Sequence, residues 1–301
     1  MPRSSLLSTH LAALRALLVL TVLLGLAYPL VVLGVAQLPG LRARADGSLL
    51  TRSGSDVPVG SRLIGQSFTD PDGTPLARYF QSRPSAAGDG YDPTSTSASN
   101  LGPEDVVDTL PDPAAAPGSD EAEGSPSLLT QVCARSAAVG ALDGVDGRRP
   151  FCTTDGVGAV LAVFHADGLA GPVTRAVSLN QACPAHPFVT TWEGTKVECA
   201  TPGEDYARGV VTPVRGDAPA TPAVPADAAT ASGSGLDPHI SRGYADLQVA
   251  RVAATRGVPA EDVRASVDRA TSGRLLGFLG EPAVNVVELN LDLDQRYPAQ
   301  K

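Results

Sequence analysis

The stretch ALLVLTVLLGLAYPLVVLGVA, residues 16–36, contains no charged side chain, and arginines stand on both sides of it. At about 1.5 Å per residue, a helix of this length spans roughly 31 Å, which is the thickness of the hydrocarbon core of a bilayer. The stretch therefore predicts a transmembrane helix over residues 16–37, preceded by a short N-terminal segment, residues 1–15. A cleaved signal peptide is the alternative, although the apolar part of a signal peptide usually has only about 7–15 residues.

Tyr28 and Pro29 lie in the second half of this stretch. A proline inside a helix removes one hydrogen bond and favours a kink, which membrane helices tolerate where neighbouring groups satisfy the freed carbonyl. Two interpretations stay open at this point. Either the pair faces a protein neighbour within the membrane, or the helix is a lone, kinked anchor in contact only with lipid.

The basic residues near the stretch leave its orientation open, because two arginines precede it and two follow it. The cysteines favour one orientation, since all four follow the stretch and lie close together in the sequence. An even, clustered set is typical of disulfides formed in an oxidising compartment. We therefore predict a cell-membrane protein with a cytoplasmic N-terminus and an extracytoplasmic main domain. Two disulfides are expected, in a pairing that the sequence does not choose, among Cys133, Cys152, Cys183 and Cys199.

Zinc binding is the alternative use of these cysteines. Cys183 and His186 have a spacing that zinc sites use, and His165 and Cys199 lie in the same region. Outside the cell, paired disulfides account better for an even number of cysteines. The sequence therefore predicts no metal site.

The composition excludes two classes of protein. The chain has 301 residues, of which 43% are hydrophobic and 18% charged, so it is too apolar to be wholly disordered. Residues 1–45 contain four basic and no acidic side chains, so that 19 basic and 32 acidic side chains follow them. Nucleic acid is not expected as a partner, because phosphate binding needs clustered lysines and arginines.

Two low-complexity segments rich in proline and alanine, residues 111–126 and 212–226, bracket the cysteines and indicate an insertion. The expected fold class is α+β: one N-terminal transmembrane helix, then an extracytoplasmic α+β domain with a disulfide-bearing, loop-rich insertion. The predicted order after the membrane helix is a first part over residues 38–103, the insertion over 104–224, a second part over 225–294 and a tail over 295–301.

Short patterns predict individual elements in the first half of the domain. Residues 61–68 and 77–82 have the composition of short strands on either side of a turn. Asn100 and Pro103 have the residue types that open a short helix. The apolar run over residues 158–164 suggests that the cysteine lobe is rich in β-structure.

The second part of the domain has the most regular patterns. Asp237 as N-cap and Pro238 as the first helical residue predict a helix that runs to Arg256 and stops at Gly257. A second helix is expected over residues 259–271. Alternating apolar and polar residues then predict a half-buried strand over residues 283–293.

Motifs of nucleotide-binding loops and of serine hydrolases are missing, because the sequence contains no GxxxxGK[ST], GxGxxG or GxSxG. The closest Gly-rich run is TASGSGLDPHIS, residues 230–241. The backbone amides of such a loop can bind an anion, or the loop is a turn that delivers the chain to a capped helix. The second interpretation is the more ordinary one.

Several short motifs occur in a characteristic order. They are Thr21 and Gly25 followed by YP (28–29), ADGSL (45–49), GSRLIGQSF (60–68), YFQSRPSAA (79–87), SNLGP (99–103), DAATASGSGLDPHIS (227–241), QVARVAATRG (248–257) and GFLGEPAVNVVELNLDLD (277–294). In this order, behind one membrane helix, the set resembles the C subunit of the Kdp-type potassium-transporting P-type ATPases, the KdpC family. The resemblance spans about residues 21–103 and 225–294, and residues 104–224 depart from the pattern of the family.

The resemblance implies an accessory single-pass subunit beside a potassium-channel-like subunit, a P-type ATPase subunit and membrane lipid. It implies a role in assembly and turnover, described for the family as that of a catalytic chaperone, with no cofactor of its own and ATP reached through the ATPase subunit. LIGQ, with Gln66, resembles part of an ATP-binding-cassette signature, which makes Gln66 the candidate for direct ATP contact. The candidates for partner contact or for a purely structural role are Tyr28, Pro29, Gly65, Gln66, Arg83, Asn100, Ser234, Gly235, Asp237 and Pro238.

The sequence contains neither the DKTGT signature of a P-type pump nor a TVGYG-type selectivity filter, and one membrane helix cannot enclose a pore. We therefore predict a subunit of a high-affinity potassium pump that is not itself an enzyme or a channel. The rival interpretation is a stand-alone, surface-anchored binding module that uses the cysteine lobe as its ligand site.

Overall fold

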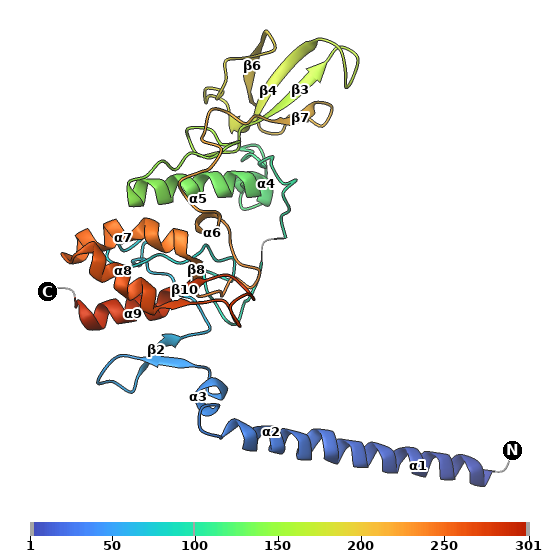
Figure 1. The fold of residues 1–301 in the computed structure, drawn as a ribbon. Coiled ribbons are helices and arrows are strands. Elements are labelled where there is room, and N and C mark those ends of the chain that lie inside the picture. Colours follow the sequence, from blue (N-terminus) through green and yellow to red (C-terminus); the bar gives the residue numbers. More distant parts are fainter. Residues whose placement is uncertain (1–2, 99, 299–301) are drawn as a thin grey trace. The chain divides into compact units, whose positions relative to one another are not determined.

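The computed structural model describes residues 3–98 and 100–298. The chain forms two units, Met1–Leu63 and Ile64–Lys301. The first unit begins with a long helix in three parts, shown in Figure 1: α1 (Arg3–Val22), the π-helical turn η1 (Leu23–Ala27) and α2 (Tyr28–Ala36). Within it, Leu7–Ala36 is long and apolar enough to cross a membrane, and its apolar window is not buried in the protein. The predicted apolar helix is confirmed, but it is already helical at Arg3 and not only from residue 16.

The π-helical turn explains how the helix accommodates Pro29. Proline has no backbone N–H, and its ring clashes with the carbonyl of the residue four positions earlier. Immediately before Pro29 the helix widens, and the N–H of Tyr28 donates to the carbonyl of Leu23, five residues back. Bulges of this kind are a recognised way to relieve such a clash.

A short hairpin completes the first unit. After α3 (Arg42–Ala45), β1 (Leu49–Thr51) pairs with β2 (Pro58–Ser61) in antiparallel orientation. The prediction of a strand over residues 61–68 is wrong beyond Ser61, where β2 ends.

The second unit contains a helical body with a small sheet. Strand β10 (Ala283–Asn285) lies between β8 (His239–Ser241) and β9 (Thr271–Ser272), and all pairings are antiparallel. The helices are α6 (Ala226–Ala229), α7 (Arg242–Arg256), α8 (Ala260–Arg269) and α9 (Val286–Arg296). Their apolar faces form one core, in which the largest fully buried side chains are Tyr244, Phe80, Ile240, Leu289 and Leu293.

Two predictions for this body need correction. Helix α7 begins after Ser241, whose hydroxyl accepts from the N–H of Tyr244, and not after Asp237, because β8 intervenes. The predicted strand over residues 283–293 is a strand only as far as Asn285, which caps α9 by accepting from the N–H of Glu288. The helix end predicted at Gly257 and the helix predicted over residues 259–271 are confirmed, the latter as α8.

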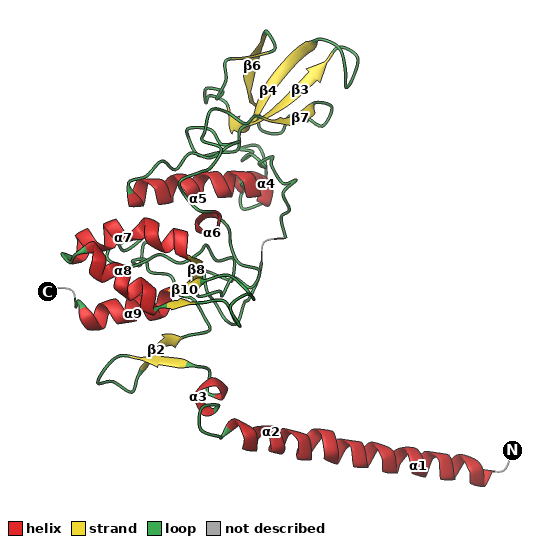
Figure 2. Cartoon of the chain, in the orientation of Figure 1, coloured by secondary structure: helices red, strands yellow, loops and turns green. Residues whose placement is uncertain are grey.

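The segment with the cysteines combines a helix and a sheet, which Figure 2 separates by colour. Helix α5 (Leu128–Asp143) follows the single turn α4 (Asp120–Glu123) and lies between the sheet and the helices α6 and α7. The sheet has the order β5-β6-β4-β3-β7, with only β4 and β6 parallel. Its strands are β3 (Val160–His165), β4 (Val173–Ala182), β5 (Thr191–Trp192), β6 (Thr195–Ala200) and β7 (Val210–Pro213). The prediction of β-rich structure is confirmed here, while α5 was not predicted.

Two further expected elements are missing from the described chain. Residues 77–82 form no strand, and no helix begins at Asn100, which is exposed in a loop. The α+β character of the body and its two disulfides are nevertheless as predicted.

Candidate functional site

Three segments that are far apart in the sequence meet in the second unit, and we call them together the motif junction: residues 65–66, 82–97 and 230–239. Hydrogen bonds join the segments directly. The N–H of Gly65 donates to Leu236 O (2.8 Å), and the hydroxyl of Ser82 donates to Gln66 O (2.9 Å). The hydroxyls of Ser85 and Thr96 donate to the carbonyls of Gly235 and Ser234, at 2.6 and 2.8 Å. The junction thus unites most of the candidate residues predicted from the sequence.

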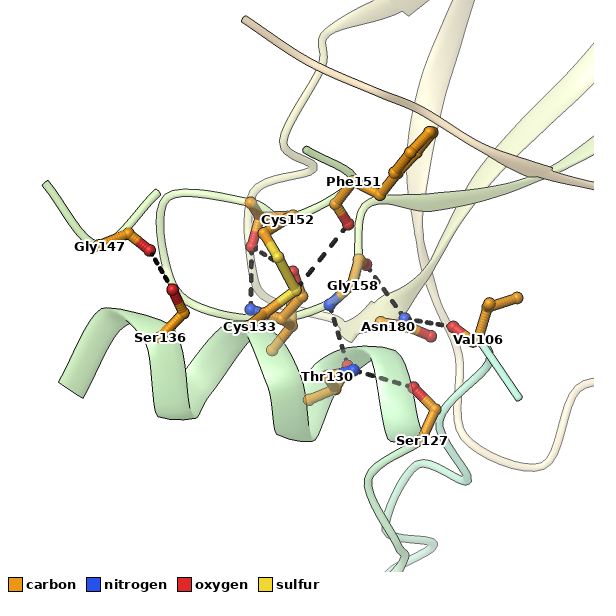
Figure 3. The surroundings of a disulfide bond; sticks show 12 residues. Val106, Ser127, Thr130, Cys133, Ser136, Gly147, Phe151, Cys152, Gly158 and Asn180 are labelled. Atoms are coloured by element: carbon orange, nitrogen blue, oxygen red, sulfur yellow. Dashed lines mark hydrogen bonds between the residues drawn. A yellow bond between two sulfur atoms is a disulfide. The ribbon is translucent and has the colours of Figure 1, made fainter. Parts of the chain in front are cut away.

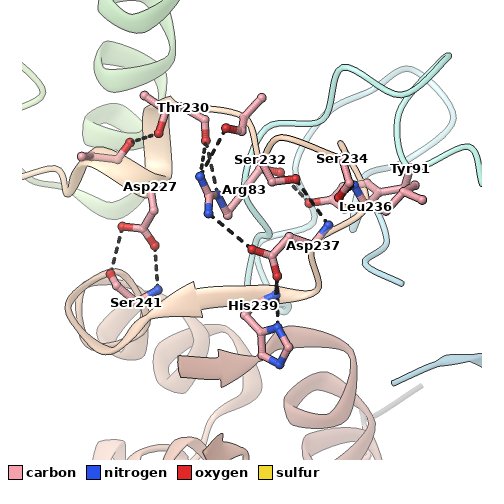
Figure 4. Close-up of polar contacts among 12 residues, drawn as sticks. Arg83, Tyr91, Asp227, Thr230, Ser232, Ser234, Leu236, Asp237, His239 and Ser241 are labelled. Carbon is pink, nitrogen blue, oxygen red and sulfur yellow. Dashed lines mark hydrogen bonds and ion pairs between the residues drawn. The ribbon is translucent and has the colours of Figure 1, made fainter. Parts of the chain in front are cut away.

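Arg83 is the central cation of the motif junction (Figure 4). Its guanidinium donates to the carbonyls of Thr230 and Ala231 and lies 3.4 Å from Asp237 Oδ2. Its side chain is only 23% exposed, so these contacts replace most of the water that a free arginine would bind. One side chain therefore holds the start and the end of the Gly-rich loop together.

Asp237 shapes the end of that loop. Its Oδ1 accepts from the N–H of His239 and lies 3.0 Å from His239 Nδ1, while Oδ2 faces Arg83. Burial acts to raise the pKa of the Asp237 carboxyl, but the hydrogen bonds with His239 and the charges of His239 and Arg83 outweigh burial and lower it. The carboxylate form is therefore the one that this turn selects.

Tyr91 closes the motif junction against Gly65. Its backbone is in the left-handed region (φ 58°), and its hydroxyl donates to Arg83 O at 2.6 Å. Burial raises the pKa of Tyr91 to about 12, so its hydroxyl stays a donor at physiological pH. A Cβ on Gly65 would lie 2.3 Å from the Tyr91 ring, which explains why glycine occupies that position. The sequence offered no signal for Tyr91, because the contact spans two segments.

Asp227 fixes the beginning of α7. Its carboxylate accepts from both the N–H and the hydroxyl of Ser241, at 2.6 and 2.9 Å, as Figure 4 shows. Ser241 then accepts from the N–H of Tyr244, so one carboxylate supports the cap of the helix. The role of Asp227 was missed, because it comes from the helix α6 and only folding brings it to Ser241.

Buried amide side chains hold the neighbouring YFQS segment. Gln248 accepts from the N–H of Gln81 and donates to its carbonyl, and Asn290 does the same for Phe80. These contacts take the place of an adjacent strand, because they satisfy the backbone groups that a sheet would pair. This explains why Phe80 and Gln81 belong to no strand, whereas residues 77–79 lie in a turn. Gln248 and Asn290 were not among the predicted candidates.

Of the other predicted residues, Tyr28, Pro29 and Asn100 lie outside these contacts, whereas Ser234 and Gly235 take part in them through their carbonyls. Tyr28 and Pro29 belong to the first unit and are exposed on α2. Asn100 and Ser234 are exposed in loops, whereas Pro238 is buried. Gly235 is buried with a φ of 70°, a conformation that favours glycine. Whether any of these residues touches a partner stays a prediction.

The structure chooses one of the three possible disulfide pairings: Cys133 with Cys152, and Cys183 with Cys199. Figure 3 shows the first, which joins α5 to the loop before β3. Beside it, the N–H of Gly158 donates to the hydroxyl of Thr130 at 2.9 Å, which ties the same two elements together. Because Cys183 is in a disulfide, the zinc alternative has no thiolate at that position.

The motif junction borders an open cavity of about 340 Å³ between residues 67–91 and α5. Arg83, Tyr91, Tyr244 and Arg135 are among the residues that line it. Arg135 donates to Gln131 Oε1 and Ala229 O, and burial lowers the pKa of its guanidinium. Within residues 3–98 and 100–298, His, Cys, Asp and Glu form no group of three that could hold a metal ion.

Comparisons with known proteins agree with the resemblance. The family model of KdpC, described as the c chain of K+-transporting ATPase, matches residues 10–109 and 206–295. A potassium-transporting ATPase KdpC subunit of Kineococcus radiotolerans is 38% identical over 295 residues, which cover 98% of this chain and 97% of that protein. The KdpC subunit of Streptomyces coelicolor is 37% identical over 94% of this chain and 90% of its own length. That of Caulobacter vibrioides is 35% identical over 95% and 92%. The middle segment, which the family model leaves unmatched, is therefore largely included in the alignments with these relatives.

Proposed function

The chain belongs to the KdpC family of K+-transporting ATPase subunits and is an accessory, non-catalytic subunit, and on that basis we propose that it supports assembly and turnover of the pump as a catalytic chaperone of the ATPase subunit. The observation that carries this proposal is the motif junction. Its polar groups bind one another across three segments, as in Arg83 with Asp237 and Ser85 with Gly235. Such an arrangement supports a rigid body that presents surfaces to partners.

The partners are a potassium-channel-like subunit and a P-type ATPase subunit, together with membrane lipid. The apolar helix supports this assignment, since its residues are exposed throughout Leu7–Val35. Tyr28, which is 64% exposed beside the π-helical turn, is the candidate for contact with a neighbouring membrane helix. A bulged helix offers a local shape that a partner can recognise.

The N-terminus is cytoplasmic and the main domain extracytoplasmic. Two disulfides in the second unit support this orientation, because disulfides persist in oxidising compartments. The test is protease added to intact cells or right-side-out vesicles, which is expected to trim the domain. Full protection without permeabilisation would contradict the orientation.

The subunit has no cofactor of its own, and ATP acts through the ATPase subunit. Gln66 contributes its carbonyl to the motif junction, where it accepts from Ser82. Gln66→Ala in the assembled pump is therefore expected to leave the KM for ATP unchanged. A several-fold rise in that KM, with normal assembly, would instead support direct contact between Gln66 and ATP.

The decisive experiment is complementation of a strain that lacks this subunit, grown at micromolar potassium. The full chain is expected to restore growth, and a chain without residues 1–40 is not, because it lacks the membrane helix. Purification of the tagged chain from the same cells is expected to recover the other pump subunits. Normal low-potassium growth without the protein would refute the proposed function, as would recovery of the chain alone.

A further inference from the structure

The hairpin between β9 and β10 carries a cluster of exposed apolar side chains, which we call the hairpin tip: Leu275, Leu276, Phe278 and Leu279. Their exposed fractions are 68%, 76%, 67% and 46%. Residues 272–282 are exposed without interruption, so the tip projects from the body. Single exposed leucines are ordinary on protein surfaces, but four large apolar side chains within five positions indicate an interaction site.

The hairpin tip has a defined backbone conformation. The N–H groups of Leu275 and Leu279 donate to each other's carbonyls, at 2.8 and 2.9 Å. The N–H of Phe278 donates to Leu275 O, and the N–H of Gly277 donates to Arg274 O. The tip is thus ordered before it binds anything, which reduces the entropy that binding would cost.

Two further features show that the hairpin tip has a specific backbone conformation and a paired base. Leu276 has a φ of 55°, a left-handed conformation that side chains with a Cβ rarely adopt. Strain of this kind concentrates at functional sites. At the base of the hairpin, Arg274 pairs with Glu281 at 2.6 Å, and beyond this ion pair the chain continues into the paired strands β9 and β10.

The charge of the hairpin and of the domain that carries it indicates whether the hairpin tip contacts lipid or protein. A loop that inserts into an anionic bilayer usually combines its apolar side chains with unpaired basic ones. Here the one arginine at the base is neutralised by Glu281, and the chain after residue 45 has 32 acidic side chains against 19 basic. Such a domain is repelled by an anionic lipid surface, whereas an uncharged pocket on a protein imposes no such cost.

We propose that the hairpin tip inserts into an apolar, uncharged pocket on an extramembrane surface of another subunit of the same pump. The inference rests on the proposed function, because that function supplies the partner. A convex tip with one aromatic and three leucine side chains has the form of an anchor residue cluster, which typically enters a concave pocket at the centre of an interface. The contact would fix the second unit of this chain to the complex, in addition to the membrane helix.

The test compares two variants of the full chain, co-expressed with the other pump subunits and purified through a tag. Leu276→Ser with Phe278→Ser is expected to lower recovery of the other subunits at least tenfold. Leu169→Ser is the matched control, because Leu169 is 81% exposed in a different loop, between β3 and β4, and its recovery is expected to equal wild type. Both variants should unfold at the wild-type urea concentration, since the altered side chains are exposed.

Wild-type recovery by the double variant would overturn the hairpin proposal alone. Failure of the wild-type chain to recover any pump subunit would overturn the proposed function together with it.

A fluorescence measurement distinguishes contact with another pump subunit from contact with lipid or with a second copy of this chain. Phe278→Trp is placed in a Trp192→Phe background, so that the hairpin tip carries the one tryptophan of the chain.

The tryptophan emission is expected to shift to the blue only when the other pump subunits are present in the same bilayer. Quenching by brominated lipids in vesicles that contain this chain alone would overturn the proposal in favour of a lipid contact. A blue shift that grows with the concentration of this chain alone would overturn it in favour of a second copy.

Discussion

Arg251 Nε of α7 lies 2.7 Å from Asp143 Oδ1 at the end of α5, and the two side chains are only 8% and 1% exposed. Arg251 also donates to the carbonyls of Ala77 and Tyr79, so it connects α5, α7 and the turn at residues 77–79. Asp143 Oδ2 has no hydrogen-bond partner in the part of the chain that the structure describes. Burial raises the pKa of the Asp143 carboxyl, and the charge and hydrogen bond of Arg251 offset this only in part. This pair therefore binds α5 to the body, and removal of either side chain would leave the other charge buried without its partner.

Asp143→Ala is expected to destabilise the second unit by about 3–5 kcal/mol, because it leaves the buried Arg251 without its counter-charge. Pulse proteolysis in urea on the purified full chain measures the change. Asp146→Ala is the control, because its partner Arg148 is 52% exposed, and such surface pairs contribute about 0–1 kcal/mol. Equal effects of the two substitutions would contradict a stabilising role for the buried pair.

Gly65→Ala is expected to disrupt the motif junction, because the new Cβ would lie 2.3 Å from the Tyr91 ring and 3.0 Å from Asp237 O. We expect a loss of several kcal/mol and weak growth at micromolar potassium. Gly233→Ala in the Gly-rich loop is the matched control, since a Cβ at that position would point into open space. Combining Gly65→Ala with Tyr91→Ala should recover part of the stability. No recovery in the double variant would mean that another contact causes the damage.

The free energy of unfolding is expected to depend on Asp292 at acid pH. Burial acts to raise the pKa of this carboxyl, but its hydrogen bonds with Arg269 and Arg296 outweigh burial and lower it. A carboxyl with a lowered native pKa contributes stability above its unfolded value of about 3.9, and this contribution is lost as the pH falls through the native pKa. The stability difference between wild type and Asp292→Asn should therefore be constant above about pH 5 and shrink below about pH 4.

The comparison for this pH series is Asp217→Asn, because Asp217 is 96% exposed and lies 3.7 Å from Arg148. Its difference from wild type should stay small at every pH. A difference for Asp292→Asn that does not change between pH 5 and pH 3 would refute the assignment of this pH dependence to Asp292.

Peptide mapping without reduction should recover Cys133 linked to Cys152 and Cys183 linked to Cys199. The intact chain should weigh four hydrogens less than the reduced chain. Replacing the first pair by serines is expected to cost about 2–4 kcal/mol, because the loop of the unfolded chain is no longer closed. Four free thiols in freshly isolated protein, or any other pairing, would contradict both the structure and the proposed extracytoplasmic location.

The five-stranded sheet should be removable without loss of pump function, whereas α5 should not. The N–H of Phe151 donates to Arg215 O at 3.0 Å, so the chain enters and leaves the sheet at neighbouring points. Deleting residues 152–214, joining the ends by a short Gly-Ser linker and changing Cys133 to serine should retain growth at micromolar potassium. Deleting residues 112–222 should abolish it, because α5 and Asp143 are lost and Arg251 stays buried without a partner. Growth of both deletion strains would show that α5 is dispensable, and failure of both would show that the sheet is needed.

Much of the chain could be predicted from local signals. The apolar run predicted the N-terminal helix because membrane-spanning length depends only on consecutive side chains. Gly257 predicted the end of α7 because the left-handed cap conformation (φ 67°) is a property of one residue. The ordered motifs predicted the family, and the four clustered cysteines predicted two disulfides.

What only the tertiary structure decided depends on partners that are distant in the sequence. Residues 77–82 look like a strand, yet residues 77–79 form a turn, and Gln248 and Asn290 satisfy the backbone groups of Gln81 and Phe80, so that no sheet forms there. Residues 286–293 alternate like a strand, but α9 buries Val286, Leu289 and Leu293, a helical spacing that the alternation concealed. The start of α7 moved to Ser241 because Asp227 of α6 supports it, and one disulfide pairing was selected because β4 and β6 lie in parallel register. In each case the short-range pattern fits two structures, and the free energy of a long-range contact selects one of them.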